Sequence, residues 1–62
     1  MRILPPEGAT VKDCCRHLRH MVRVRTKKTA LRRHSDYMQA SGPVGDLVML
    51  KFVLPRYGYR IL

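Results

Sequence analysis

The clearest pattern in the chain is a stripe of apolar residues with helical spacing that begins at Val11. At 100° per residue these side chains share one face, whereas the intervening charged residues project elsewhere. Thr10 and Asp13 form a capping-box pattern, in which the Thr10 hydroxyl accepts from the Asp13 amide and the carboxylate reaches back. We therefore predict an amphipathic helix that starts at Val11. Its apolar face comprises Val11, Cys14, Cys15, Leu18, Met21 and Val22.

The apolar stripe changes phase after about three helical turns. The next apolar residues, Leu31 and Met38, would fall on roughly the opposite side of a continued helix. Three interpretations fit: a continuous helix over residues 10–41, a helix broken within residues 24–29, or a strand over residues 21–29, where cations alternate with Val and Thr. We rank the continuous helix first and the broken helix second.

Gly42 and Pro43 carry a helix-stop signal. Glycine readily takes the left-handed conformation that ends a helix, and proline cannot continue one. We expect residues 42–46 to form a linker, with Asp46 as the cap of the segment that follows.

Residues 47–54 are apolar at seven of eight positions, interrupted only by Lys51. This length suits a strand or a short helix and is too short to cross a bilayer, so we expect no membrane-spanning segment. Because the pattern leaves no polar face, we expect the segment to pack against neighbouring proteins. The expected protein contacts are Leu47, Leu50, Phe52, Val53 and Leu54.

Both ends of the chain read as extended arms. Residues 1–9 contain Pro5 and Pro6, which fix φ and remove two backbone donors, and residues 55–62 form a tail rich in Arg and Tyr. A chain of 62 residues buries little surface on its own and often needs a larger host. The expected fold is therefore mostly α: one basic amphipathic helix with extended N- and C-terminal arms and no independent globular core.

Positive charge is concentrated in the middle of the chain. The sequence has 13 Lys and Arg against 4 Asp and Glu, a formal net charge of +9, and eight of the 18 residues from Arg16 to Arg33 are cations. Such density predicts a polyanionic partner, and RNA phosphates provide sequence-independent affinity. The expected RNA contacts are Arg16, Arg19, Arg23, Arg25, Lys27, Lys28, Arg32, Arg33, Arg56 and Arg60.

No catalytic or metal-binding arrangement can be assembled from the reactive residues. Adjacent Cys14 and Cys15 do not share a tetrahedral metal easily, and there is no second cysteine pair, so we expect two buried thiols with apolar surroundings and no metal or cofactor. The four carboxylates form no recognisable acid-base pair. We therefore expect neither an enzyme nor a small-molecule substrate. The other residues considered as metal ligands are His17, His20 and His34.

These features predict a structural RNA-binding component of a large ribonucleoprotein. We favour a small ribosomal protein that contacts rRNA through its basic helix and neighbouring proteins through its apolar ends. The N-terminus lacks a secretory signal, which indicates an intracellular location, and the excess of Arg over Lys with few glycines favours mitochondria over the cytosol. The alternative is an accessory, non-catalytic subunit of a mitochondrial membrane complex of the respiratory type. A free basic amphipathic peptide is disfavoured because the apolar stripe is short.

Overall fold

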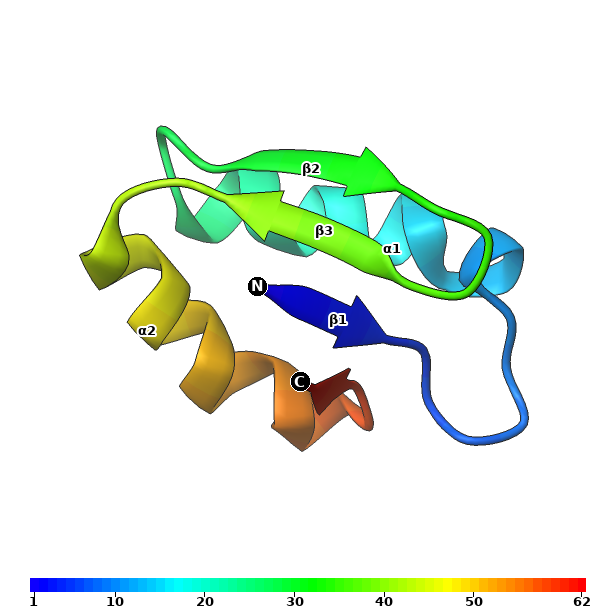
Figure 1. The fold of residues 1–62 in the computed structure, drawn as a ribbon. Coiled ribbons are helices and arrows are strands. Elements are labelled where there is room, and N and C mark those ends of the chain that lie inside the picture. The colour runs from blue at the N-terminus through cyan, green and yellow to red at the C-terminus, as the bar shows by residue number, and fades with distance from the viewer.

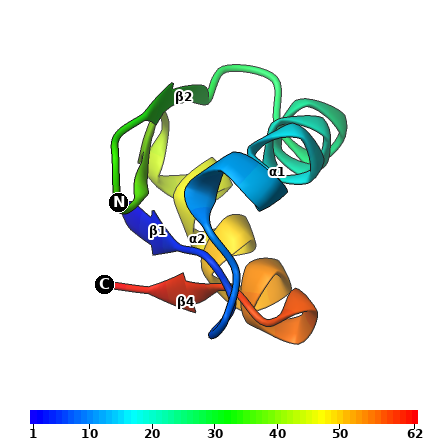
Figure 2. The ribbon, with the colours of Figure 1, turned by 90° about the vertical axis from the view of Figure 1, so that its right-hand side faces the viewer.

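Four short strands form one antiparallel sheet, and both α-helices cover the same face of it (Figures 1 and 2). The computed structural model describes all 62 residues. The strand order is β2-β3-β1-β4, so β3 lies between β1 and β2 and is antiparallel to both. This is the split βαβ arrangement of ferredoxin-like folds. The elements are β1 (Arg2–Leu4), α1 (Val11–Arg25), β2 (Ala30–Arg33), β3 (Met38–Ser41), α2 (Val44–Val53), the 3-10 helix η1 (Leu54–Tyr57) and β4 (Arg60–Ile61).

Helix α1 starts where the capping pattern predicts. The Asp13 amide donates to Thr10 Oγ1 at 3.1 Å, and the Thr10 amide donates to Asp13 Oδ2 at 3.2 Å. Hydrogen bonding from Thr10, first from its side chain and then from its backbone, lowers the pKa of the Asp13 carboxyl. The predicted apolar face is also confirmed, since it supplies all the buried residues of the helix while both cysteines are half-buried. The buried residues are Val11, Leu18, Met21 and Val22.

The expectation of a helix through residue 41 is wrong. Helix α1 ends at Arg25, and the Thr26 hydroxyl donates to the Val22 carbonyl at 2.6 Å, which satisfies this buried side chain at the helix end. Residues 30–41 instead form the β2–β3 hairpin. Leu31 pairs with Ala40 on the side of the helices, so the change of phase after the stripe marks a switch from helical to strand periodicity. The break considered near residues 24–29 coincides with the helix end, but no second helix follows directly.

The two expected arms are strands of the sheet. Ile3 of β1 pairs with Met38 on one side and with Ile61 of β4 on the other, and its side chain is 1% exposed. Strand β1 is therefore an inner strand rather than a free arm. The extended conformation of the ends was expected, but their partners lie far away in the sequence and no local pattern identifies them.

Gly42 and Asp46 have roles different from those expected. Gly42 follows β3, and a Cβ atom there would lie 2.6 Å from Thr29 Oγ1 and 2.9 Å from Thr29 Cα, so close backbone packing demands glycine. Asp46 lies in the first turn of α2 and accepts a hydrogen bond from the Thr29 hydroxyl at 3.0 Å, while α2 has no side-chain cap. These contacts join the turn before β2 to the start of α2.

The chain has a hydrophobic core of its own, between the sheet and the two helices, which contradicts the expected absence of a globular core. Both α-helices and two of the four strands, β1 and β3, contribute to it, as do η1 and the residue before β4. Most of the apolar segment, residues 47–53, belongs to α2, and Leu50 of this helix is buried in the core. The buried core residues are Ile3, Val11, Leu18, Met21, Val22, Met38, Ala40, Leu50, Leu54 and Tyr59.

An aromatic cluster joins α1 to the C-terminal segment. The Tyr59 hydroxyl lies 2.8 Å from His17 Nδ1, and the two rings stack at 5.9 Å between centroids. The ring of Tyr57 lies 5.8 Å from that of His17. The Tyr59 side chain is 4% exposed, and this burial raises its pKa to about 12.

The close approach at Gly42 yields a stability prediction. Gly42→Ala should lower the free energy of unfolding by about 1 to 3 kcal/mol, because the methyl group meets the Thr29 backbone. Gly45→Ala is the matched control, since nothing lies within 4 Å of an added Cβ there and alanine favours the helix. Urea unfolding of the isolated chain, followed by circular dichroism, measures both. Equal destabilisation, or the lack of a cooperative transition in the wild type, would contradict this packing.

Burial of Tyr59 predicts a loss of stability at high pH. The folded chain keeps the Tyr59 proton to a higher pH than the unfolded chain, so this contribution is fully present below about pH 10 and disappears towards pH 12. A difference of two pKa units corresponds to about 3 kcal/mol. Tyr59→Phe should cost about 1 kcal/mol at neutral pH but flatten the decline, whereas Tyr57→Phe, at a half-exposed side chain, should keep the wild-type decline. Urea unfolding between pH 8 and 12 tests this, and an unchanged pH profile of Tyr59→Phe would disprove it.

Candidate nucleic-acid interface

A row of cations follows one edge of α1. Lys12, Arg16, Arg19 and Arg23 are spaced by four, three and four residues, so they lie on one side of the helix and are all exposed. The apolar face of α1 is fixed against the core, and this forces the row outward. The side chains therefore form a continuous basic edge rather than scattered charges.

This basic edge borders an open cleft of about 1260 Å³. Asp13 and His20 also line the cleft, and the Asp13 carboxylate is already engaged by Thr10. We define the basic cleft by four cations, by Thr29 in the turn before β2 and by Leu31 of β2. The four cations are Arg16, Arg19, Arg23 and Lys27.

The four cations of the basic cleft are free to meet an external anion. Within the chain, only Arg25 and Arg60 donate hydrogen bonds from a cationic side chain. Unpaired cations that share one cleft repel each other, and a bound polyanion relieves this repulsion.

The remaining predicted RNA contacts do not line the basic cleft. Lys28 lies exposed in the turn before β2. Arg32 and Arg33 are neighbours on edge strand β2 and so point to opposite faces of the sheet, and Arg33 pairs with buried Met38 on the helix side. The basic residues that the sequence presents as one segment are therefore divided among separate faces.

Three further predicted RNA contacts lie elsewhere in the fold. The Arg25 guanidinium lies 3.5 Å from the Tyr57 hydroxyl of η1, and Arg56 belongs to η1 itself. Arg60 donates to the Pro5 carbonyl from Nε at 3.3 Å and from a terminal nitrogen at 3.2 Å. Arg60 thus links β4 to the segment after β1. Arg25, at the end of α1, and Arg56, within η1, both lie at η1.

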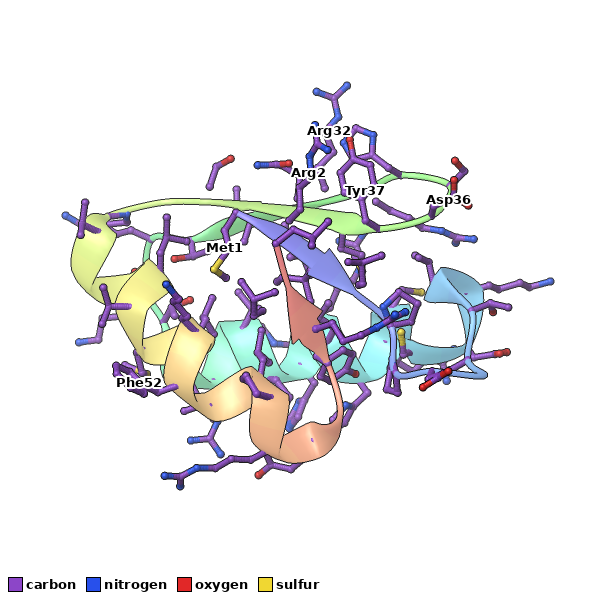
Figure 3. All side chains as sticks on the ribbon, turned by 60° about the horizontal axis from the view of Figure 1, so that its bottom comes forward. Met1, Arg2, Arg32, Asp36, Tyr37 and Phe52 are labelled. Carbon is purple, nitrogen blue, oxygen red and sulfur yellow. The ribbon has the colours of Figure 1, made fainter.

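The face of the sheet opposite the helices is uncovered and carries cationic and aromatic side chains. Register places Arg2, Gln39 and Arg32 in one row across β1, β3 and β2. Figure 3 shows Arg2, Arg32 and Tyr37 directed away from the helices. The rings of His34 and Tyr37 stack at 4.6 Å, and the Arg2 guanidinium carbon lies 5.1 Å from the centroid of the Tyr37 ring.

Sequence reasoning missed Arg2 and Tyr37 as members of a common surface. The expected fold places Arg2 in an extended arm and Tyr37 in a long helix. Alternation of Gln39 and Ser41 with buried Met38 and Ala40 is a strand signal that could have revealed the open face, but the pairing of β1 with β3 has no local signature.

The predicted protein contacts divide between the core and the surface. Leu50 and Leu54 are completely buried in the core of the chain, while Leu47 and Val53 are half-buried. Phe52 is 70% exposed and points away from the sheet (Figure 3). Three more apolar side chains of α2 are exposed, so this helix is apolar on both its inner and outer sides. We define the outer face of α2 as Val44, Val48, Met49 and Phe52.

The cysteines and histidines assemble no reactive centre. No three His, Cys, Asp or Glu side chains gather closely enough to hold a metal ion. Cys14 Sγ lies 3.3 Å from the Thr10 carbonyl oxygen, and burial raises the pKa of its thiol, which disfavours the nucleophilic thiolate. Neither α-helix has the length and apolar character that a bilayer crossing requires.

Comparison with protein families, curated proteins and solved structures finds no match to this chain. The split βαβ topology supports many unrelated functions and assigns none by itself. Functional inference therefore depends on the chemistry of the basic cleft, the open sheet face and the outer face of α2.

Proposed function

We propose that this protein is a structural RNA-binding component of a ribonucleoprotein and that the basic cleft contacts RNA phosphates. The observation that carries the proposal is the gathering of Arg16, Arg19, Arg23 and Lys27 around one open cleft, with no carboxylate paired to them. Guanidinium groups fork onto phosphate oxygens, and such contacts supply affinity without reading sequence.

The length of the basic edge favours a polymer over a small anion. Arg16 and Arg23 are seven residues apart, about 10 Å along the helix axis, and Lys27 extends the row beyond the helix end. A single phosphate or nucleotide would leave part of this row unneutralised. A nucleic-acid backbone offers successive charges along the whole cleft, and each contact releases counterions.

The outer face of α2 supports contact with a neighbouring protein in the same assembly. Val44, Val48 and Phe52 recur at intervals of four residues, so they share one side of the helix, and all three are exposed. An exposed apolar set of this kind is typical of protein interaction sites. The chain would then hold RNA at the basic cleft and a protein at α2.

The assembly we favour is a ribosome, with rRNA as the ligand, and a mitochondrial ribosome over a cytosolic one. Support comes from composition, namely the net charge of +9 and the excess of Arg over Lys. The second candidate is an accessory subunit of a mitochondrial membrane complex, which the exposed apolar side chains of α2 favour. The two candidates differ in whether incorporation of the protein into its assembly depends on RNA.

Removing cations from the basic cleft should weaken RNA binding. Arg19→Ala with Arg23→Ala should reduce affinity for RNA and lower the slope of log affinity against log salt by about 1 for each lost contact. The control, Lys51→Ala with Arg56→Ala, removes the same charge from α2 and η1 and should leave affinity and slope near wild type. Fluorescence anisotropy with a labelled RNA at several salt concentrations measures both quantities. Equal losses in the two variants would indicate a net-charge effect and refute a specific cleft.

Ribonuclease treatment should release the protein from its assembly. Under the proposal, the tagged chain sediments with ribonucleoprotein particles and moves to light fractions after digestion. Val48→Ser with Phe52→Ser should reduce this incorporation yet preserve RNA affinity in isolation, because both side chains are exposed. Retention in detergent-solubilised membrane complexes that contain no RNA would instead support the accessory-subunit function.

A further inference from the structure

The open face of the sheet is a second surface with a chemistry different from that of the basic cleft. Flat side chains dominate it: the His34 and Tyr37 rings stack with an interplanar angle of 14°, and the Arg2 guanidinium lies over the Tyr37 ring. We infer that this face binds unpaired nucleobases by stacking, so that the protein engages a single-stranded stretch of RNA. This inference rests on the proposed function, because it takes RNA as the ligand.

The fold brings these side chains together at one end of the open face, and we define the stacking platform as Arg2, His34 and Tyr37. Tyr37 directly precedes β3, and the His34 amide donates to the Tyr37 carbonyl at 2.9 Å, which closes the β2–β3 turn and brings the two rings together. Arg2 reaches Tyr37 because β1 pairs with β3 in the register that sets Arg2 opposite Gln39. The platform is therefore assembled by sheet pairing rather than by a flexible loop alone.

The charges on this face suit a nucleic acid. Arg2 and Arg32 flank Gln39 in the same row, and both are exposed. Asp36 is the only carboxylate of the β2–β3 turn, and it is exposed. Cations beside flat rings allow one nucleotide to stack its base and to place its phosphate near a guanidinium.

Unpaired bases fit this surface better than duplex RNA or protein. In a duplex the faces of the bases are stacked on one another and closed to side chains, whereas single strands can splay a base onto an aromatic ring or a guanidinium plane. Gln39 and Ser41 add donors and acceptors that can reach base edges. A protein interface would need an apolar centre, and the middle row of this face is Arg-Gln-Arg.

The test compares two oligonucleotides that differ only in their bases. The probes are an oligoadenylate RNA and an abasic oligomer of equal length, which carries the same phosphates. The wild type should bind the oligoadenylate roughly tenfold more tightly than the abasic oligomer, because base stacking is lost in the latter. Titrations by fluorescence anisotropy give both affinities.

Variants of the stacking platform test whether it causes the preference for the oligoadenylate over the abasic oligomer. Tyr37→Ala with His34→Ala should abolish the preference while the affinity for the abasic oligomer stays unchanged, and Tyr37→Leu, which keeps apolar bulk, should reduce it. Arg2→Lys keeps the charge but loses the planar group, so it should also lower the preference. Arg19→Ala with Arg23→Ala should weaken both probes equally and leave the ratio intact. Circular dichroism verifies that each variant is folded.

The outcomes distinguish failure of the stacking site from failure of the proposed RNA-binding function. If the wild type binds both probes equally, or if the platform variants keep the preference, the stacking site is refuted while phosphate binding stands. Equal binding is also the result expected if this face contacts a protein. If the wild type binds neither probe, the proposed function fails together with this inference.

Discussion

Strand β1 pairs with β3 on one side and with β4 on the other, and the sheet is held together through it. Ile3 sits between Met38 and Ile61 in one row, so a single inner strand connects the N-terminus, the hairpin and the C-terminus. Its buried side chain lies under both helices, within the core cluster. Without this strand the β2–β3 hairpin would have no partner beyond itself, and an isolated hairpin is marginal in water.

Sheet pairing also explains how a chain with a net charge of +9 folds compactly. Both helices cover one face, so the core requires only one apolar side from α1, and its cations are left on the outer edge. The second face of the sheet needs no apolar residues and carries Arg2 and Arg32. The positive charges are thereby spread over the basic cleft, the open sheet face and the region of η1, which limits repulsion within each. Helix α2 differs because it exposes apolar side chains as well as burying them.

Local sequence signals predicted local structure well and distant pairing not at all. The Thr10–Asp13 capping box and the buried face of α1 follow from contacts within one or two helical turns, and both are present. The β2–β3 hairpin was missed because residues 30–41 were interpreted with helical spacing, although its two strands are local partners. The two end strands were missed because their partners lie far away in the chain. Gly42 also shows that a local pattern can mislead. Its neighbours in the sequence resemble a helix stop, but glycine is required there because the backbone of Thr29 packs closely against it.

Local patterns in the chain predict the start of α1, its buried face, the density of positive charge and the apolar character of the segment that becomes α2. Which cations lie close together follows from the fold. It grouped Arg16, Arg19, Arg23 and Lys27 around one cleft, tied Arg60 to the Pro5 carbonyl, and brought Arg2 over Tyr37. Helical spacing relates residues only a few positions apart, whereas strand register joins positions from opposite ends of the chain, so a local pattern cannot reveal the second kind of contact.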